Sequence, residues 1–134
     1  MQNESNRGRI LVVDDEAHIV HVVALKLRNA GFEVLTAGDG DEALAMLAGE
    51  PVSMVVTDLQ MPAMTGIELA RAMVARPALA QIPVLMLTAR GHLLREGEAD
   101  SANIRRVVHK PFSPRALLAE IESVLADAPR REAA

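Results

Sequence analysis

The chain has 134 residues and no cysteine, and its 14 basic and 18 acidic side chains give a formal net charge of −4. This length predicts one domain, and the lack of cysteine excludes disulfides and thiolate metal sites. Without a basic excess, direct binding to nucleic acid is not expected. The apolar runs are too short to span a bilayer and the N-terminus has no apolar signal core, which predicts a cytoplasmic protein without a membrane partner.

Short apolar runs alternate along the chain with segments of helical periodicity. In chain order we expect a strand at 9–13, a helix at 16–30, a strand at 32–36, a helix at 41–47, a strand at 52–57, a helix at 66–75, strands at 82–87 and 104–109, and a last helix from Pro114. Residues 1–8 and 127–134 are expected to be disordered tails, which leaves 9–126 as the domain.

Individual residues support these helices. Gly31 is a typical stop for the first helix, and either Leu25 or Leu27 continues its apolar face. Ser113 is a typical N-cap for the last helix, with Pro114 in the first helical position. Strands that alternate with helices in this way favour an α/β fold, a doubly wound five-stranded parallel sheet with helices on both faces.

Ligands of a doubly wound sheet bind beyond the carboxyl ends of its strands, and four of the expected strands end in polar side chains. In strand order these residues are Asp14 and Asp15, Asp58, Thr88, and Lys110. Crowded carboxylates resist ionisation unless a cation is present, and oxygen ligands without His or Cys favour Mg²⁺ or Mn²⁺. Lys110 and Thr88 are suited to hold a phosphoryl group, and Asp58 to act as a nucleophile that forms an aspartyl phosphate.

Each of these residues, taken alone, has a simpler explanation. Asp14 or Glu16 would serve as a helix N-cap, and Asp58 would serve in a turn. Complementary groups at four strand ends are difficult to explain by capping, so the functional interpretation is favoured. His18 and His21 share a helix face and offer a second metal site, although a position on the solvated surface is favoured.

Over about residues 9–125 the chain resembles the receiver domain of bacterial two-component response regulators. The motifs that carry the resemblance are ILVVDDE, VVTDLQMPAMTGIEL, VLMLTA and HKPFSP, which occur in the family's order and spacing. The resemblance implies a flavodoxin-like sheet with strand order 2-1-3-4-5.

The same resemblance implies roles for individual residues. Asp58 corresponds to the phospho-acceptor, and Thr88 and Lys110 to the residues that grip the phosphoryl group. A cis peptide bond is implied between Lys110 and Pro111. The implied ligands of the metal are Asp14, Asp15, Asp58 and the backbone carbonyl of Gln60.

The favoured function is a phosphorylation-dependent signalling switch, in which a histidine kinase or phosphotransfer protein phosphorylates Asp58 and the changed surface engages a downstream protein. It would be a phosphoacceptor with slow self-dephosphorylation at most, and not an enzyme. One alternative is a phosphate shuttle or sink in a phosphorelay. A less favoured one is an aspartyl-nucleophile phosphohydrolase, because haloacid-dehalogenase-type phosphatases carry an acidic residue where this chain has Gln60.

The segment before the last strand departs from the family pattern. One hypothesis is that residues 91–103 form a short, shifted or mobile helix that phosphorylation orders or displaces through Thr88. The alternative is an ordinary helix that slides to bury Leu94 and Ala102. The residues that depart from the pattern are Gly97, Asp100, Asn103, Ile104 and Val107, the last of which replaces an aromatic residue.

Overall fold

The computed structural model describes residues 7–89 and 103–127. In this part of the chain the elements are β1 (Arg9–Val13), α1 (Ala17–Asn29), β2 (Glu33–Ala37), α2 (Gly40–Gly49), β3 (Met54–Asp58), α3 (Gly66–Val74), β4 (Val84–Thr88), β5 (Ile104–His109) and α5 (Pro114–Asp127). The predicted boundaries differ from these by two residues at most.

The five strands form one parallel sheet in the order β2-β1-β3-β4-β5, which confirms the predicted fold class and strand order. β3 and β4 are buried at every residue and β1 at all but its first. Strands covered on both faces are typically continuous apolar runs rather than alternating ones, which is why these three strands were easy to recognise in the sequence.

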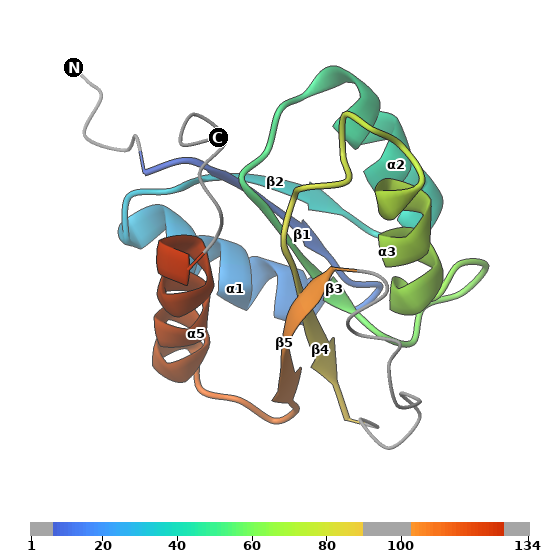
Figure 1. The fold of residues 1–134 in the computed structure, drawn as a ribbon. Coiled ribbons are helices and arrows are strands. Elements are labelled where there is room, and N and C mark those ends of the chain that lie inside the picture. Colours follow the sequence, from blue (N-terminus) through green and yellow to red (C-terminus); the bar gives the residue numbers. More distant parts are fainter. Residues whose placement is uncertain (1–6, 90–102, 128–134) are drawn as a thin grey trace.

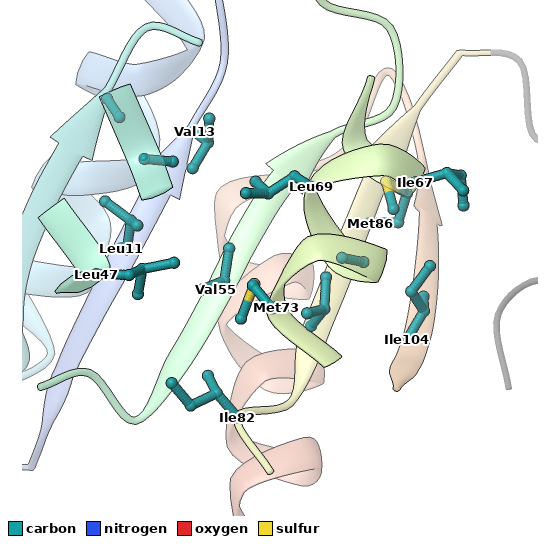
Figure 2. Close-up of a cluster of buried hydrophobic side chains, with 14 of the residues drawn as sticks. Leu11, Val13, Leu47, Val55, Ile67, Leu69, Met73, Ile82, Met86 and Ile104 are labelled. Carbon is teal, nitrogen blue, oxygen red and sulfur yellow. The ribbon is translucent and has the colours of Figure 1, made fainter. Parts of the chain in front are cut away.

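Helices α1 and α5 cover one face of the sheet, and α2 and α3 cover the other (Figure 1). Successive side chains of a strand point to opposite faces, so each inner strand contributes to both layers. Leu11, Val55 and Met86 point to the α2–α3 side, where Figure 2 shows them with Leu69 and Met73 of α3. The other layer is built on the intervening strand residues, which are Ile10, Val12, Met54, Val56, Leu85 and Leu87.

Three of the described helices begin with a side-chain cap. Asp39 caps α2, Thr65 forms a capping box with Glu68 at α3, and the Ser113 hydroxyl accepts a hydrogen bond from Ala116 N–H at 2.9 Å at the start of α5. The prediction for Ser113 is therefore confirmed. α1 is different, because its N-cap residue, Glu16, makes no capping hydrogen bond with its side chain.

The apolar face of α1 includes Leu27, which is buried, and leaves Leu25 51% exposed. The segment before β1 is held by contacts of Arg7 that the sequence did not indicate. Arg7 pairs with Glu122 of α5 at 3.0 Å, and its guanidinium lies 4.6 Å from the ring centroid of Phe32. No helix in the described ranges is long and apolar enough to cross a membrane.

Several predictions concern residues that the structure does not describe. The predicted tails lie there except for residues 7, 8 and 127, and so does the segment 91–103 except for Asn103. Asn103 has a positive φ of 55°, a conformation that asparagine tolerates better than most residues, and its side chain donates to Ile82 O at 3.0 Å. Val107 is half-buried and packs on the α2–α3 side of the sheet.

Candidate functional site

The polar residues predicted at the strand ends meet at one edge of the sheet. Asp14 directly follows β1, Asp58 is the last residue of β3, Thr88 is the last of β4, and Lys110 directly follows β5. These strands are parallel and adjacent, so their carboxyl ends lie side by side. The backbone N–H of Lys110 donates to Thr88 O at 2.9 Å, which continues the pairing of β4 and β5 into the site.

Three carboxylates form the centre of this edge. One oxygen from each of Asp14, Asp15 and Asp58 lies within 4.8 Å of the others. Asp14 and Asp58 are buried, whereas Asp15 is exposed. A cavity of about 280 Å³ opens beside them, and its lining includes Asp15 and Asp58 together with Gln60, Thr88 and Lys110. The structure therefore brings together every residue that the sequence predicted for the site.

Lys110 reaches into the acidic cluster and contacts three carboxylates. Its Nζ lies 3.2 Å from Asp14 Oδ2, 3.3 Å from Asp58 Oδ1 and 3.2 Å from Glu16 Oε1. The peptide bond between Lys110 and Pro111 is cis, as the resemblance implied. The first two contacts were expected from the strand ends, but the contact with Glu16 was not.

Burial and crowding shape the acidity of these groups. Burial raises the pKa of Asp14, and the ammonium of Lys110 only partly opposes this effect. Burial, followed by the charge of Asp14, likewise raises the pKa of Asp58. Burial by itself would lower the pKa of Lys110, but the charges of Asp14 and Asp58 outweigh it and the pKa is raised. The site thus carries more negative charge than one lysine neutralises.

The backbone around Asp58 is held in place by short hydrogen bonds. Leu59 N–H donates to Leu87 O of β4 at 2.9 Å, and Gly66 N–H donates to Leu59 O at 2.8 Å. A Cβ on Gly66 would overlap the carbonyl oxygen of Asp58, so the start of α3 approaches this strand end more closely than any other residue type permits. Between them, Ala63 adopts a positive φ of 69°.

The donor set fits a hard divalent cation. Three carboxylates converge without a histidine or cysteine, and two of them are buried with raised pKa values, which a cation would reverse. Within the described ranges this is the one group of three or more His, Asp or Glu side chains close enough to hold a metal ion. His18 and His21 are exposed on α1 and do not belong to it.

Glu16 is the residue of the site that sequence reasoning missed. It was considered only as a possible N-cap, and it does occupy that position of α1, but its side chain contacts Lys110 instead of the helix. One signal was available, since glutamate is not among the residues preferred at an N-cap. Asp14 does act locally as well, because its Oδ1 accepts a hydrogen bond from Glu16 N–H at 2.9 Å.

Comparisons with known proteins agree with this geometry. The family model of the response regulator receiver domain matches residues 10–122. The chemotaxis protein CheY of Pseudomonas aeruginosa is 39% identical over 117 residues, which are 87% of this chain and 94% of that protein. The phosphate regulon transcriptional regulatory protein PhoB of the same organism is 36% identical over 116 residues, but the chain spans about half its length, as it does for several other curated relatives.

Solved structures give the same result. The chemotaxis response regulator CheY4 of Vibrio cholerae superposes with a TM-score of 0.81 at 34% identity, covering 87% of this chain and 97% of that one. The response regulator TrrA of Thermotoga maritima, solved in complex with Mg²⁺-BeF, gives a TM-score of 0.77 at 28% identity, covering 87% and 97% of the two chains. The resemblance drawn from the four sequence motifs is confirmed.

Proposed function

Because the chain belongs to the response regulator receiver domain family, we propose that Asp58 accepts a phosphoryl group from a histidine kinase or a phosphotransfer protein and that the altered surface then signals to a protein partner. Members of this family are phosphoacceptors and not conventional enzymes. The observation that carries the proposal is the position of Asp58, at the end of the central strand, 3.3 Å from the ammonium of Lys110 and beside two further carboxylates.

The chemistry assigned to these residues is a phosphoryl transfer. A carboxylate oxygen of Asp58 attacks phosphorus and forms a P–O bond, while the P–N bond of the donor phosphohistidine breaks. The electron pair of that bond stays on the imidazole nitrogen, which takes up a proton from solvent. Such transfers depend mainly on positioning and on neutralising charge on the phosphoryl oxygens, which is the role of the Lys110 ammonium and the Thr88 hydroxyl.

A divalent cation held by Asp14, Asp15, Asp58 and the backbone carbonyl of Gln60 would neutralise further charge on the phosphoryl group. The complex of TrrA with Mg²⁺-BeF supports this assignment by analogy, as does the convergence of three carboxylates here. Mn²⁺ satisfies the same oxygen ligands.

The surface beside the site suits a protein donor. A groove of about 380 Å³ is lined by Glu16 and Lys110 from the site and by apolar residues that include Ile19, Val22 and Phe112. This groove reaches Lys110, which contacts Asp58, so a partner could dock there while its phosphohistidine reaches the carboxylate. The family is typically cytoplasmic, which supports the location expected from the sequence.

A phosphate shuttle or sink would use the same residues and differ only in its partner, so reverse transfer to a phosphotransfer protein distinguishes it. A phosphohydrolase is disfavoured, because Gln60 carries an amide where that mechanism needs an acid.

The proposed function is tested by incubation with acetyl phosphate and Mg²⁺, followed by intact mass spectrometry. We expect the mass of one added phosphoryl group in the wild-type protein, its loss in Asp58→Asn, and its loss when a chelator removes the cation. Asp41→Asn is a matched control, because Asp41 is an exposed acid in the first turn of α2. Equal labelling of Asp58→Asn and the wild-type protein would refute the assignment.

A further inference from the structure

Lys110 is surrounded by three carboxylates in the structure. Its Nζ donates hydrogen bonds to Asp14 Oδ2 and Glu16 Oε1, both at 3.2 Å, and lies 3.3 Å from Asp58 Oδ1 in an ion pair. A phosphoryl group on Asp58 would present oxygens that lie beyond the carboxylate. As Lys110 moves toward one of them, its hydrogen bonds to Asp14 and Glu16 compete with the new contact.

Asp58 itself becomes the phosphorylated group, so the comparison is between Asp14 and Glu16. The Asp14 side chain is 0% exposed, so its charge would be left with little water around it if Lys110 moved away. The Glu16 side chain is 62% exposed, so water can replace the ammonium. Glu16 is therefore the carboxylate that Lys110 can release at the smallest cost.

The position of Glu16 in the chain supports a role beyond helix capping. The other described helices are preceded by Asp39, Thr65 and Ser113, each of which caps its helix with its side chain. Glu16 occupies the same position at α1, makes no such bond, and extends instead to Lys110. A residue that breaks a local preference in this way usually serves another contact.

The geometry points to Glu16 as a positioning residue that holds Lys110 in the unphosphorylated state and competes with the phosphoryl group for it. This inference rests on the proposed function of Asp58. Glu16 sets how readily the protein responds: while its carboxylate holds the ammonium, the phosphorylated arrangement is disfavoured, and loss of that contact favours it. Glu16 does not touch the reacting atoms and is not assigned a catalytic role.

Beryllofluoride in the presence of Mg²⁺ serves as the phosphoryl probe. The chain contains no tryptophan or tyrosine, so the titration is followed by backbone amide NMR signals instead of intrinsic fluorescence. Glu16→Gln keeps the length of the side chain and an equally poor cap but removes the charge. We expect it to bind beryllofluoride about two- to fivefold more tightly than the wild type, the range for an exposed ion pair. Asp41→Asn, with the same change in net charge, should bind like the wild type.

Two further variants separate the contact with Lys110 from a general effect of charge. Glu16→Asp keeps the charge but is one methylene shorter, so it should lose the contact and also bind more tightly. In a Lys110→Gln background, Glu16→Gln should change the affinity no more than Asp41→Asn does. An effect of Glu16→Gln that survives there, or that Glu16→Asp does not share, would overturn the inference. If Lys110→Gln does not fold, the comparison with Glu16→Asp remains decisive.

The result for the wild-type protein separates a failure of the proposed function of Asp58 from a failure of the role of Glu16. Wild-type protein that binds no beryllofluoride overturns the proposed function of Asp58, and the role of Glu16 with it. Wild-type protein that binds the probe, with Glu16→Gln indistinguishable from it, overturns the role of Glu16 alone.

Discussion

The ammonium of Lys110 lies 3.3 Å from Asp58 Oδ1, so the side chain proposed to receive a phosphoryl group is already paired with a cation. Both groups are largely shielded, with 15% of the Lys110 side chain and 9% of the Asp58 side chain exposed. Charges that are shielded from water interact more strongly than exposed ones. One lysine nevertheless faces several carboxylates, and this excess of negative charge has consequences that can be measured.

Removal of Lys110 should strengthen the binding of a divalent cation. Lys110→Ala deletes a positive charge that contacts Asp14 and Asp58, two of the proposed ligands. A cation that enters the cluster then meets less repulsion, and the affinity for Mg²⁺ should rise on the order of tenfold. Isothermal titration with Mg²⁺ measures it, and Arg76→Ala, which removes an exposed charge after α3, is the control. A large fall in affinity would contradict the assigned role.

The same variant should respond poorly to beryllofluoride. Without the ammonium the phosphoryl mimic loses its cationic partner, and a charge-assisted hydrogen bond of this kind is among the stronger ones in proteins. Tighter Mg²⁺ binding together with weaker beryllofluoride binding distinguishes a phosphoryl contact from simple unfolding, which would weaken both.

Replacement of Asp58 should stabilise the metal-free protein. Burial and the charge of Asp14 raise the pKa of Asp58 above its ordinary value of 3.8, so the folded state binds this proton more tightly than the unfolded chain. The protonated carboxyl of Asp58 therefore stabilises the folded state. This stabilisation is fully present at a pH below the ordinary pKa, and it is lost as the pH rises through the folded-state pKa. At pH 7 the ionised carboxylate is therefore a burden, and Asp58→Asn should unfold at a higher temperature by the equivalent of about 1 kcal/mol.

Thermal unfolding in a chelator at pH 7 and at pH 4 tests this sign. The gain in stability from Asp58→Asn should shrink at pH 4, where the wild-type carboxyl is closer to neutral. It should also shrink in Mg²⁺, because the cation stabilises the wild-type protein more than a variant that lacks one of the proposed ligands. Asp41→Asn should show no such pattern. A midpoint for Asp58→Asn below that of the wild type in the chelator would contradict the prediction.

The strands and the residues at their ends could be predicted from the sequence, but several side-chain positions could not. The buried strands were recognisable as apolar runs, and a parallel sheet must bring their carboxyl ends together, so the sequence alone could place Asp14, Asp58 and Lys110 in one site. Leu25 and Leu27 were left as alternatives, although helical spacing favours Leu27, which lies one turn after the buried Val23, and Leu25 is 51% exposed.

Contacts that depend on side-chain rotamers were beyond the sequence. Glu16 and Lys110 are far apart in the chain, and their contact requires the turn into α1 and the loop after β5 to be in place. The positive φ of Ala63 was equally hidden, because alanine gives no local signal for a left-handed conformation.

Ala63→Gly should stabilise the protein. A φ of 69° is strained for alanine and free of that strain for glycine. The gain is reduced by the greater flexibility of glycine in the unfolded chain, so we expect about 0.5–1 kcal/mol from denaturant unfolding. Ala45→Gly is the matched control, because the same substitution at an exposed position in the interior of α2 should destabilise by about 1 kcal/mol. Loss of stability in both variants would show that Ala63 is not strained.

Gly66→Ala should displace the backbone of Asp58 and so weaken the site. A Cβ at this position would overlap the carbonyl oxygen of Asp58, lie 2.7 Å from Met86 Sδ and 3.1 Å from Leu59 Cα. Met86 is flexible, but the backbone of β3 and of the following residue is hydrogen-bonded to β4, so it cannot move without disturbing Asp58. Overpacking of this kind typically costs about 1–3 kcal/mol. We expect that loss in denaturant unfolding, together with weaker binding of beryllofluoride, because the displaced carboxylate no longer aligns with Lys110.

Gly49→Ala is the matched control. A Cβ at Gly49 would meet nothing within 4 Å, so that variant should keep its affinity and be as stable as the wild type or more so. Wild-type affinity in Gly66→Ala would mean that the start of α3 does not position Asp58.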